Sequence, residues 1–248
     1  MTRILRSSFA IGILLSVGTT LVHAQGSRFG SATRGVDDDN IGVGIEQVGL
    51  LIYPPSMLYN GVDSGEVRIS ISVDKDGVLK DCLLTAYTAR EFADAALAAV
   101  KHWRYLPAKA AGVPTASRSD LLFEFRSSGV VVQTLPGAEM RRIYFSSLND
   151  RFQYKPCQLR DLDRIPTPVH VVSPMVNSDE KVHTVTVEFF IDEQGGVRMA
   201  AVSREEAGNV FAAAAVAAVE QWRFEPPLRK GAPVLVLAQQ EFNFRPKK

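Results

Sequence analysis

The sequence predicts an α+β protein built from two tandem repeats, each a three-stranded antiparallel sheet (β-β-α-β) with one helix packed on a face. Three observations support this prediction. The chain is internally duplicated, apolar residues alternate where strands are expected, and an alanine-rich apolar stripe predicts one helix in each half. We expect the repeats at residues 45–127 and 166–248, joined by a partly ordered linker at 128–165.

A shift of 119 residues places the second half of the sequence on the first. Trp103 then falls on Trp222, so both tryptophans of the chain are matched, and Phe92 falls on Phe211. Before the helix the shift is 118, because Gly195-Gly196 adds one residue to a turn. These large residues end or begin an apolar helical stripe, so we predict that Phe92, Trp103, Phe211 and Trp222 belong to the two cores.

The strands follow from the alternation of apolar residues. It runs from Val67 to Val73 in the first half and from Val185 to Ile191 in the second, which predicts strands with one buried face. A turn with Asp and Gly follows each strand, and these residues favour hairpin turns. We therefore predict a second strand in each half, at 78–86 and 197–203, and a last strand at 117–126 and 234–245.

The two helices have recognisable start signals. Thr88 with Glu91 three residues later fits a capping box, and Asn209 is a suitable N-cap for the second helix. Pro107 and Pro226 follow the apolar stripes, and a proline disfavours helical geometry in the residue before it. We therefore expect each helix to end ahead of its proline.

The composition excludes several classes of function. With 28 basic and 27 acidic residues, the chain lacks the basic excess of a nucleic-acid-binding protein. It contains no Gly-x-Ser-x-Gly sequence, no phosphate-binding loop and no Cys/His spacing typical of zinc sites. We therefore expect no enzymatic activity, no cofactor, no metal, no nucleic acid and no small-molecule substrate.

The first 24 residues predict a signal for secretion. Arg3 and Arg6 precede a mostly apolar stretch at 7–22, and Val22-His23-Ala24 fits a cleavage site after Ala24. The apolar stretch is shorter than the ~20 residues that a membrane-spanning helix needs. The alternative is an uncleaved membrane anchor. Residues 25–44 are rich in Gly, Ser and Asp, and we expect them to be flexible.

The chain has only two cysteines, Cys82 and Cys157. A secreted protein reaches a compartment in which disulfides persist, so a bridge between them is one interpretation. The other is that Cys82 serves as a small apolar residue of a strand. The sequence leaves both open.

One motif occurs twice and carries a family resemblance. It reads Phe-x-x-Ala-Ala-x-x-Ala-Val-x-x-Trp-Arg-aromatic-x-Pro, followed by Gly-x-Pro and Phe-x-Phe, at 92–125 and 211–244. Tyr53-Pro54 stands ahead of the first copy, and Ser173-Pro174 stands ahead of the second. The duplicated motif resembles the C-terminal domain of TonB, an energy transducer of the bacterial envelope.

The resemblance implies a periplasmic binding function and no catalysis. TonB-like domains add a short extended peptide, the TonB box of an outer-membrane receptor, to the edge of their sheet. The unpaired N–H and C=O groups of an edge strand supply the main-chain bonds. By this analogy the peptide lies along the last strand of a repeat, and we prefer the second repeat. The expected border comprises Val234, Leu235, Val236, Leu237, Ala238, Gln239 and Gln240 there, with Arg118, Asp120, Tyr53 and Pro54 in the first repeat.

Two alternatives remain open at this point. The last strands of the two repeats could pair with each other, which would make an internal pseudo-dimer with a structural role. A homodimer is the other form of association left open. If residues 7–22 are not cleaved, the chain could instead be a membrane-anchored energy transducer. The long Pro-, Glu- and Lys-rich spacer of such transducers is missing from this sequence.

Overall fold

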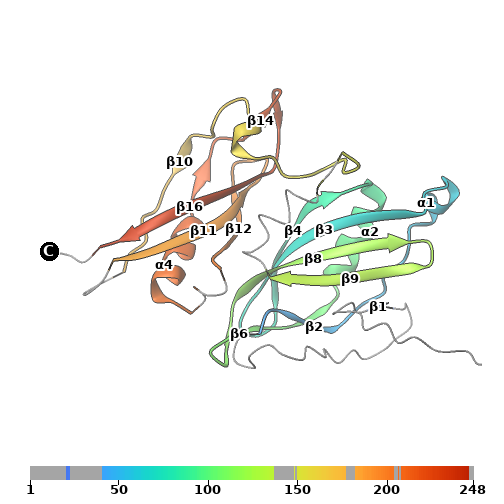
Figure 1. Cartoon of the computed structure of the whole chain (residues 1–248), viewed down its shortest axis with the longest axis horizontal. Helices are drawn as coiled ribbons and strands as arrows, with labels where there is room; N and C mark the ends of the chain where they lie inside the picture. The colour runs from blue at the N-terminus through green and yellow to red at the C-terminus, as the bar shows by residue number, and fades with distance from the viewer. Residues whose placement is uncertain are drawn as a thin grey trace, which may run out of the picture.

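A computed structural model describes residues 21–22, 41–136, 148, 150–176, 182–203, 206 and 208–245. Two α+β units follow each other along the chain, and each has a sheet with a helix on one face (Figure 1). The predicted fold class is confirmed. The secretion signal and the flexible segment predicted at 1–24 and 25–44 lie outside the described residues, apart from residues 21–22 and 41–44.

The first unit has a five-stranded antiparallel sheet in the order β1-β9-β8-β3-β4. Its main elements are β3 (Ser64–Val73), β4 (Leu79–Tyr87), α2 (Arg90–Val100), β8 (Ser117–Arg126) and β9 (Gly129–Pro136), and β1 (Leu21–Val22) pairs with β9. The smaller elements are β2 (Gly44–Gln47), α1 (Pro55–Tyr59), β5 (Arg104–Leu106), β6 (Ala108–Ala110) and β7 (Val113–Thr115).

The second unit has a three-stranded antiparallel sheet in the order β12-β11-β16. It is formed by β11 (His183–Ile191), β12 (Val197–Ala201) and β16 (Val236–Phe244), with α4 (Val210–Val219) on one face. The smaller elements are η1 (Leu159–Asp161), β10 (Pro168–His170), β13 (Arg223–Phe224), β14 (Leu228–Arg229) and β15 (Ala232–Pro233).

The strand register repeats with the shift found in the sequence. Val67 of β3 lies opposite Phe123 of β8, and Val185 of β11 lies opposite Phe242 of β16. The first residues of these pairs are 118 positions apart and the second 119. The two units are therefore copies in strand pairing as well as in sequence, and β3, β4, α2 and β8 correspond to β11, β12, α4 and β16.

The hairpin turns are also equivalent. An Asp carboxylate accepts backbone N–H groups two and four residues ahead, both at 2.9 Å for Asp74 and at 3.1 and 2.7 Å for Asp192. The bond from the Val78 N–H is the main reason that the pKa of Asp74 lies below its ordinary value. Gly77 and Gly195 complete the turns with φ angles of 80° and 84°. The predicted turn chemistry is therefore present in both copies.

The helix stripes pack on the sheets as their periodicity indicates. Phe92, Trp103 and Trp222 are buried at 0%, 6% and 8% exposure, whereas Phe211 is half-buried against the second core. The Trp222 Nε1–H donates to the Val172 carbonyl at 2.8 Å. Each helix ends before its tryptophan, so both indole rings lie just after the last helical residue.

Only one of the two predicted helix caps is present. The Asn209 Oδ1 accepts the Phe211 N–H at 2.9 Å and caps α4, as predicted. The predicted capping box at Thr88 is wrong. Ala89 is the N-cap residue of α2, without a side-chain bond, and the Thr88 Oγ1 accepts the Glu66 N–H of β3 at 2.9 Å.

Several other predictions meet a definite outcome. The linker predicted at 128–165 includes strand β9 and helix η1, so much of its described part has regular structure. Cys82 and Cys157 are free, so the structure does not support the disulfide interpretation: Cys82 packs against the core of the first unit and Cys157 lies in the core of the second. Burial raises the pKa of the Cys82 thiol.

Within the described ranges, no helix is long and apolar enough to cross a membrane.

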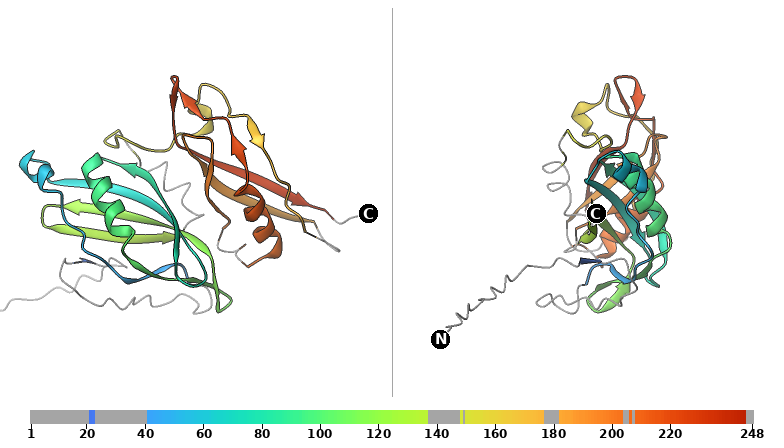
Figure 2. Two further views of the ribbon diagram at one scale, coloured as in Figure 1. Left: turned by 180° about the vertical axis from the view of Figure 1, so that it is seen from behind. Right: turned by 90° about the vertical axis from the view of Figure 1, so that its right-hand side faces the viewer.

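The two units touch through the sheet faces that lie opposite their helices. Strand β12 contacts β3, β4 and β8 of the first unit (Figures 1 and 2). An apolar cluster fills the contact, formed by Leu83, Phe190, Met199, Leu235 and Leu237, with Tyr154 at its side. We call it the inter-repeat cluster.

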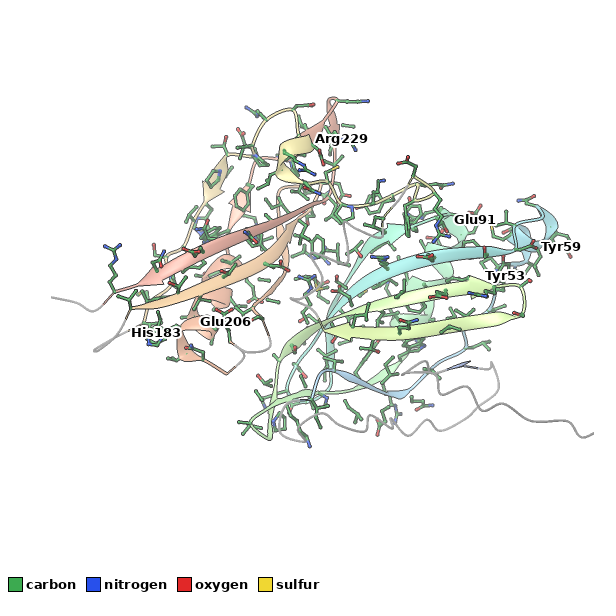
Figure 3. The ribbon with its side chains drawn as sticks, viewed as in Figure 1. Tyr53, Tyr59, Glu91, His183, Glu206 and Arg229 are labelled. Carbon is green, nitrogen blue, oxygen red and sulfur yellow. The ribbon has the colours of Figure 1, made fainter. Side chains whose placement is uncertain are left out.

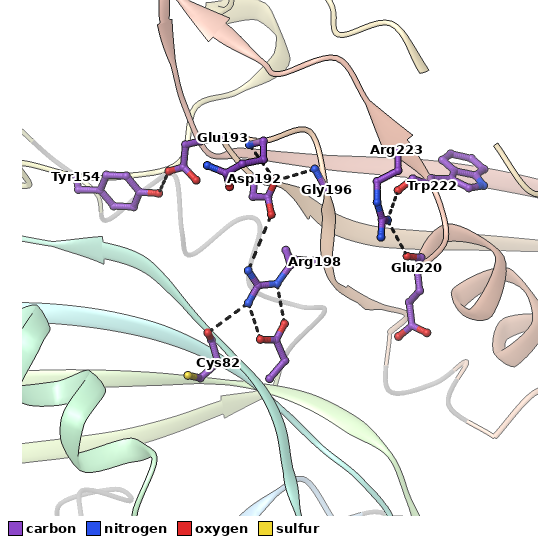
Figure 4. A network of polar contacts seen from close by, with 11 residues as sticks. Cys82, Tyr154, Asp192, Glu193, Gly196, Arg198, Glu220, Trp222 and Arg223 are labelled. Carbon is purple, nitrogen blue, oxygen red and sulfur yellow. Dashed lines mark hydrogen bonds and ion pairs between the residues drawn. The ribbon is translucent and has the colours of Figure 1, made fainter. Parts of the chain in front are cut away.

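Polar bonds surround the inter-repeat cluster. The Arg198 guanidinium donates to both carboxylate oxygens of Asp81, at 2.8 and 2.5 Å, and it approaches Asp192 and the Cys82 carbonyl (Figure 4). The Tyr154 hydroxyl donates to Glu193 at 2.5 Å. The two repeats therefore share a partly apolar, partly ionic interface.

Candidate peptide-binding border

The outer side of β16 is paired near its start, and further along it has no strand partner in the described part of the chain. On its inner side β16 pairs with β11 along its whole length, without a register shift. On its outer side, the Cys157 N–H donates to the Leu235 carbonyl at 2.8 Å, and the Leu237 N–H donates to the Cys157 carbonyl at 3.2 Å. In the part of the chain that the structure describes, no strand pairs with this side beyond Leu237.

The two bonds to Cys157 identify the main-chain groups that face outward. Because the N–H and C=O of a strand residue point to the side opposite those of its neighbour, Leu235 and Leu237 set the pattern for the rest of β16. The outward residues beyond them are Gln239, Glu241 and Asn243. Their N–H and C=O groups form a row along the border, and the Gln240 side chain donates to the Glu241 carbonyl at 2.7 Å.

The side chains along this border differ between the two faces of the sheet. Gln239, Glu241 and Asn243 are exposed on the face opposite α4, where the Asn243 Nδ2 donates to Glu241 at 3.1 Å. Phe242 and Phe244 are half-buried on the helix face. An added strand would therefore meet polar groups on one face and aromatic rings on the other.

The equivalent border in the first repeat is occupied. β9 pairs with β8 from Ser119↔Pro136 to Arg126↔Gly129, so β8 has a strand on both sides. The last strands of the two repeats consequently do not pair with each other, and the pseudo-dimer joined through those strands is not found. The two repeats therefore present different borders: β9 fills that of β8, whereas no strand of the described residues pairs with the outer side of β16 beyond Leu237.

Arg118 and Asp120 do not lie on a free border, which corrects their sequence-based assignment. They are 5% and 2% exposed and form an ion pair at 3.3 Å. Arg118 also donates to the Met199 carbonyl at 3.2 Å and lies 4.9 Å from the Phe190 ring, while Asp120 accepts a bond from Ser70. The physical reason is that their face of β8 packs against the second repeat.

Tyr53 and Pro54 lie in the first repeat, away from the β16 border. The Tyr53 hydroxyl donates to the Val62 carbonyl at 2.5 Å, and its ring packs against Phe92 at 5.3 Å. Pro54 is the N-cap residue of α1. Figure 3 shows Tyr53 at the α1 end of the first sheet and His183 at the distal end of the second. Tyr53 and Pro54 therefore fix the start of the first repeat.

The expected border in the second repeat coincides only in part with the open one. Leu235, Val236, Leu237 and Ala238 are buried, Val234 is half-buried, and only Gln239 and Gln240 of the expected set are exposed. Sequence reasoning missed Glu241 and Asn243. The change from an apolar run to Gln239 was the available signal, because it marks where the strand leaves the covered region.

The family model described as Gram-negative bacterial TonB protein C-terminal matches residues 51–127 and 179–246, which together make more than half of the chain. The chain belongs to the TonB C-terminal family. Both matches contain the hairpin, helix and last strand of a repeat, so the chain has two tandem TonB C-terminal domains. No match was found among curated proteins or among solved structures.

Membership fixes the general class of the protein. TonB C-terminal domains are non-enzymatic domains of the cell envelope that take part in transport-associated interactions, generally with outer-membrane proteins. Among the described residues, no group of three or more His, Cys, Asp or Glu side chains could hold a metal ion.

Proposed function

We propose that this protein is a periplasmic TonB-like binding module, exported by a cleavable signal and linked to TonB-dependent transport. It captures an extended segment of an outer-membrane receptor or of another envelope protein by adding it as a strand to β16. Within the repeat, Gln239, Glu241 and Asn243 carry the main-chain groups that pair with this segment. No catalytic step is required of any residue.

The observation that carries the proposal is the contrast between the two last strands. β8 is paired on both sides, whereas the outer side of β16 has no strand partner beyond Leu237 among the described residues. An edge strand with unpaired N–H and C=O groups is a template for another strand. Exposed Glu241 on this border disfavours indiscriminate pairing between copies, because charged residues protect sheet edges.

The proposal can be tested by removing one outward N–H. Proline has no N–H, and edge strands tolerate it where that group points to solvent. We expect Glu241→Pro to weaken binding of a TonB-box peptide at least tenfold, and Glu241→Ala, which keeps the N–H, to bind as the unchanged protein does. Affinity would be measured by calorimetric titration.

Amide hydrogen exchange shows where the peptide binds and whether the sheet remains intact in the variants. Peptide should slow exchange at Gln239, Glu241 and Asn243 in the unchanged protein. Exchange at Ala238 and Gln240, whose N–H groups face β11, should stay slow in both variants and show that the sheet is intact. Equal affinities of the two variants, or unchanged exchange along β16 at saturating peptide, would contradict the proposal.

A further inference from the structure

The first repeat already carries a strand at the position that is open in the second. β9 follows β8 after a two-residue turn and pairs with it in antiparallel register. With the shift of 119 residues, the β8 residues Phe123 and Phe125 correspond to Phe242 and Phe244 of β16. β9 is therefore an example, within the same chain, of a strand that pairs with the outer side of a repeat's last strand.

Two valines of β9 cover the aromatic side of the first sheet. Val132 lies opposite Phe123, and Val130 lies opposite Phe125. The phenylalanines are 0% exposed and the valines 6% and 7% exposed. All four belong to the first core, because directly opposite residues on one face of an antiparallel pair are in contact. The residue between the valines, Val131, points to the other face.

Among the described residues, no outer strand covers the corresponding phenylalanines of the second repeat. Phe242 and Phe244 pack against Trp222 and Phe211, with ring centroids 5.8 and 5.1 Å apart, yet both remain half-buried. In the first repeat Tyr53 contacts Phe125 at 6.4 Å, whereas Ser173-Pro174 replaces the Tyr-Pro pair in the sequence ahead of the second repeat. The apolar surface left over lies at the border where a strand would be added.

On the basis of the proposed function, we propose that the β16 border selects a strand of the β9 type. The segment runs antiparallel to β16 and carries β-branched aliphatic residues at two positions separated by one. The first of these lies opposite Phe244 and the second opposite Phe242. The residue between them lies opposite Asn243, on the polar face, where side chains of many kinds fit.

The pattern follows from burial and register together. Covering Phe242 and Phe244 removes apolar surface from water, which favours aliphatic residues at the two opposing positions. β-branched residues fit a half-buried pleated surface well. The antiparallel direction follows from the template, in which Asp120, Leu122 and Glu124 pair with Leu135, Gln133 and Val131 at the places of Gln239, Glu241 and Asn243.

The test uses a synthetic peptide with the sequence of residues 129–136 and two appended lysines for solubility, titrated into the purified protein. Peptides with Val130→Asn or Val132→Asn should bind at least tenfold more weakly, which corresponds to about 1.4 kcal/mol. The matched control is the peptide with Val131→Asn, which should bind within about threefold of the unchanged peptide. Equal binding of all four peptides would overturn the proposal.

The direction of the strand is read from a nitroxide at the peptide's N-terminus. In the antiparallel arrangement it broadens the amide signals near Phe244, and in a parallel arrangement it broadens those near Ala238. Broadening near Ala238, or protection of β8 instead of β16, would overturn the proposal. If TonB-box peptides protect β16 but the β9 peptide does not bind, the selectivity is wrong and the proposed function stands. If neither peptide binds, the proposed function itself fails.

Discussion

The Asn209 side chain stabilises the start of α4 by accepting the N–H of Phe211, one of the donors that a helix leaves without an internal partner. Replacing such a cap by alanine costs about 1 kcal/mol. We therefore expect Asn209→Ala to lower the free energy of unfolding by about 1 kcal/mol in urea titrations. Asn209→Ser keeps an acceptor and should stay near the unchanged value, and a cost as large as that of alanine would exclude capping as the cause.

Thr88 shows why the other cap could not be predicted from local sequence. Its pattern with Glu91 satisfies the same rule, but its hydroxyl accepts a bond from Glu66, which lies 22 residues earlier on β3. Two requirements compete for one oxygen atom, and the strand contact prevails. A rule that uses neighbouring residues alone can find Asn209 but cannot detect a competitor brought in by the sheet.

The hairpin turn of the second repeat depends on a glycine at a crowded position. Gly195 has a φ of 84°, and a Cβ atom there would collide with the Phe224 carbonyl. Gly231 has a φ of 76°, but a Cβ atom there would meet nothing within 4 Å. Comparing substitutions at the two glycines separates backbone strain from steric crowding. Both positions have a positive φ, but only at Gly195 would a side chain also collide with a neighbour.

Alanine at these two turns should therefore cost different amounts. Gly231→Ala should lower the free energy of unfolding by about 1–2 kcal/mol, the penalty for a left-handed alanine. Gly195→Ala should cost roughly 1–3 kcal/mol more, because the backbone of β13 must move. Urea unfolding monitored by tryptophan fluorescence gives both values. Equal costs would show that the turn and β13 are not held together as closely as the structure indicates.

Strand β9 marks the limit of sequence reasoning at the level of secondary structure. The duplication predicted the hairpin, helix and last strand of each repeat, including 117–126 at its observed bounds. The run from Val130 to Val132 has no copy in the second half and is too short for its periodicity to separate a strand from other apolar segments. The sequence therefore favoured the second repeat, but it could not show that β9 covers β8 or that, among the described residues, β16 lacks an outer strand beyond Leu237.

The arrangement of the two repeats depends on side chains that alternate along β11. Phe189 and Ile191 face α4 inside the second repeat, whereas Phe190 faces the first repeat in the inter-repeat cluster, where it is 0% exposed. The buried ion pair of Arg118 and Asp120 lies against the same ring. Both partners of this pair lie on β8, so the contacts that separation of the repeats would break are the Arg118 bond to the Met199 carbonyl and the packing of its guanidinium on the Phe190 ring.

The position of the β16 border relative to the first repeat is thus fixed by the inter-repeat cluster. If the cluster couples the repeats, the unchanged protein should unfold in a single calorimetric transition. Phe190→Ala removes the central ring and should cost about 3–5 kcal/mol. It should also divide the unfolding into two transitions, one for each repeat, because the apolar contact between them is lost.

Phe189→Ala is the matched control. It removes the same side-chain volume one residue earlier in the chain, from the core of the second repeat. It should lower the stability by a similar amount but leave the cluster intact, so unfolding should remain a single transition at lower temperature. The comparison therefore tests coupling and not merely the loss of a buried ring. If Phe190→Ala also unfolds in one transition, the two repeats are held together by the Arg198–Asp81 and Arg118–Met199 bonds, without need of the apolar cluster.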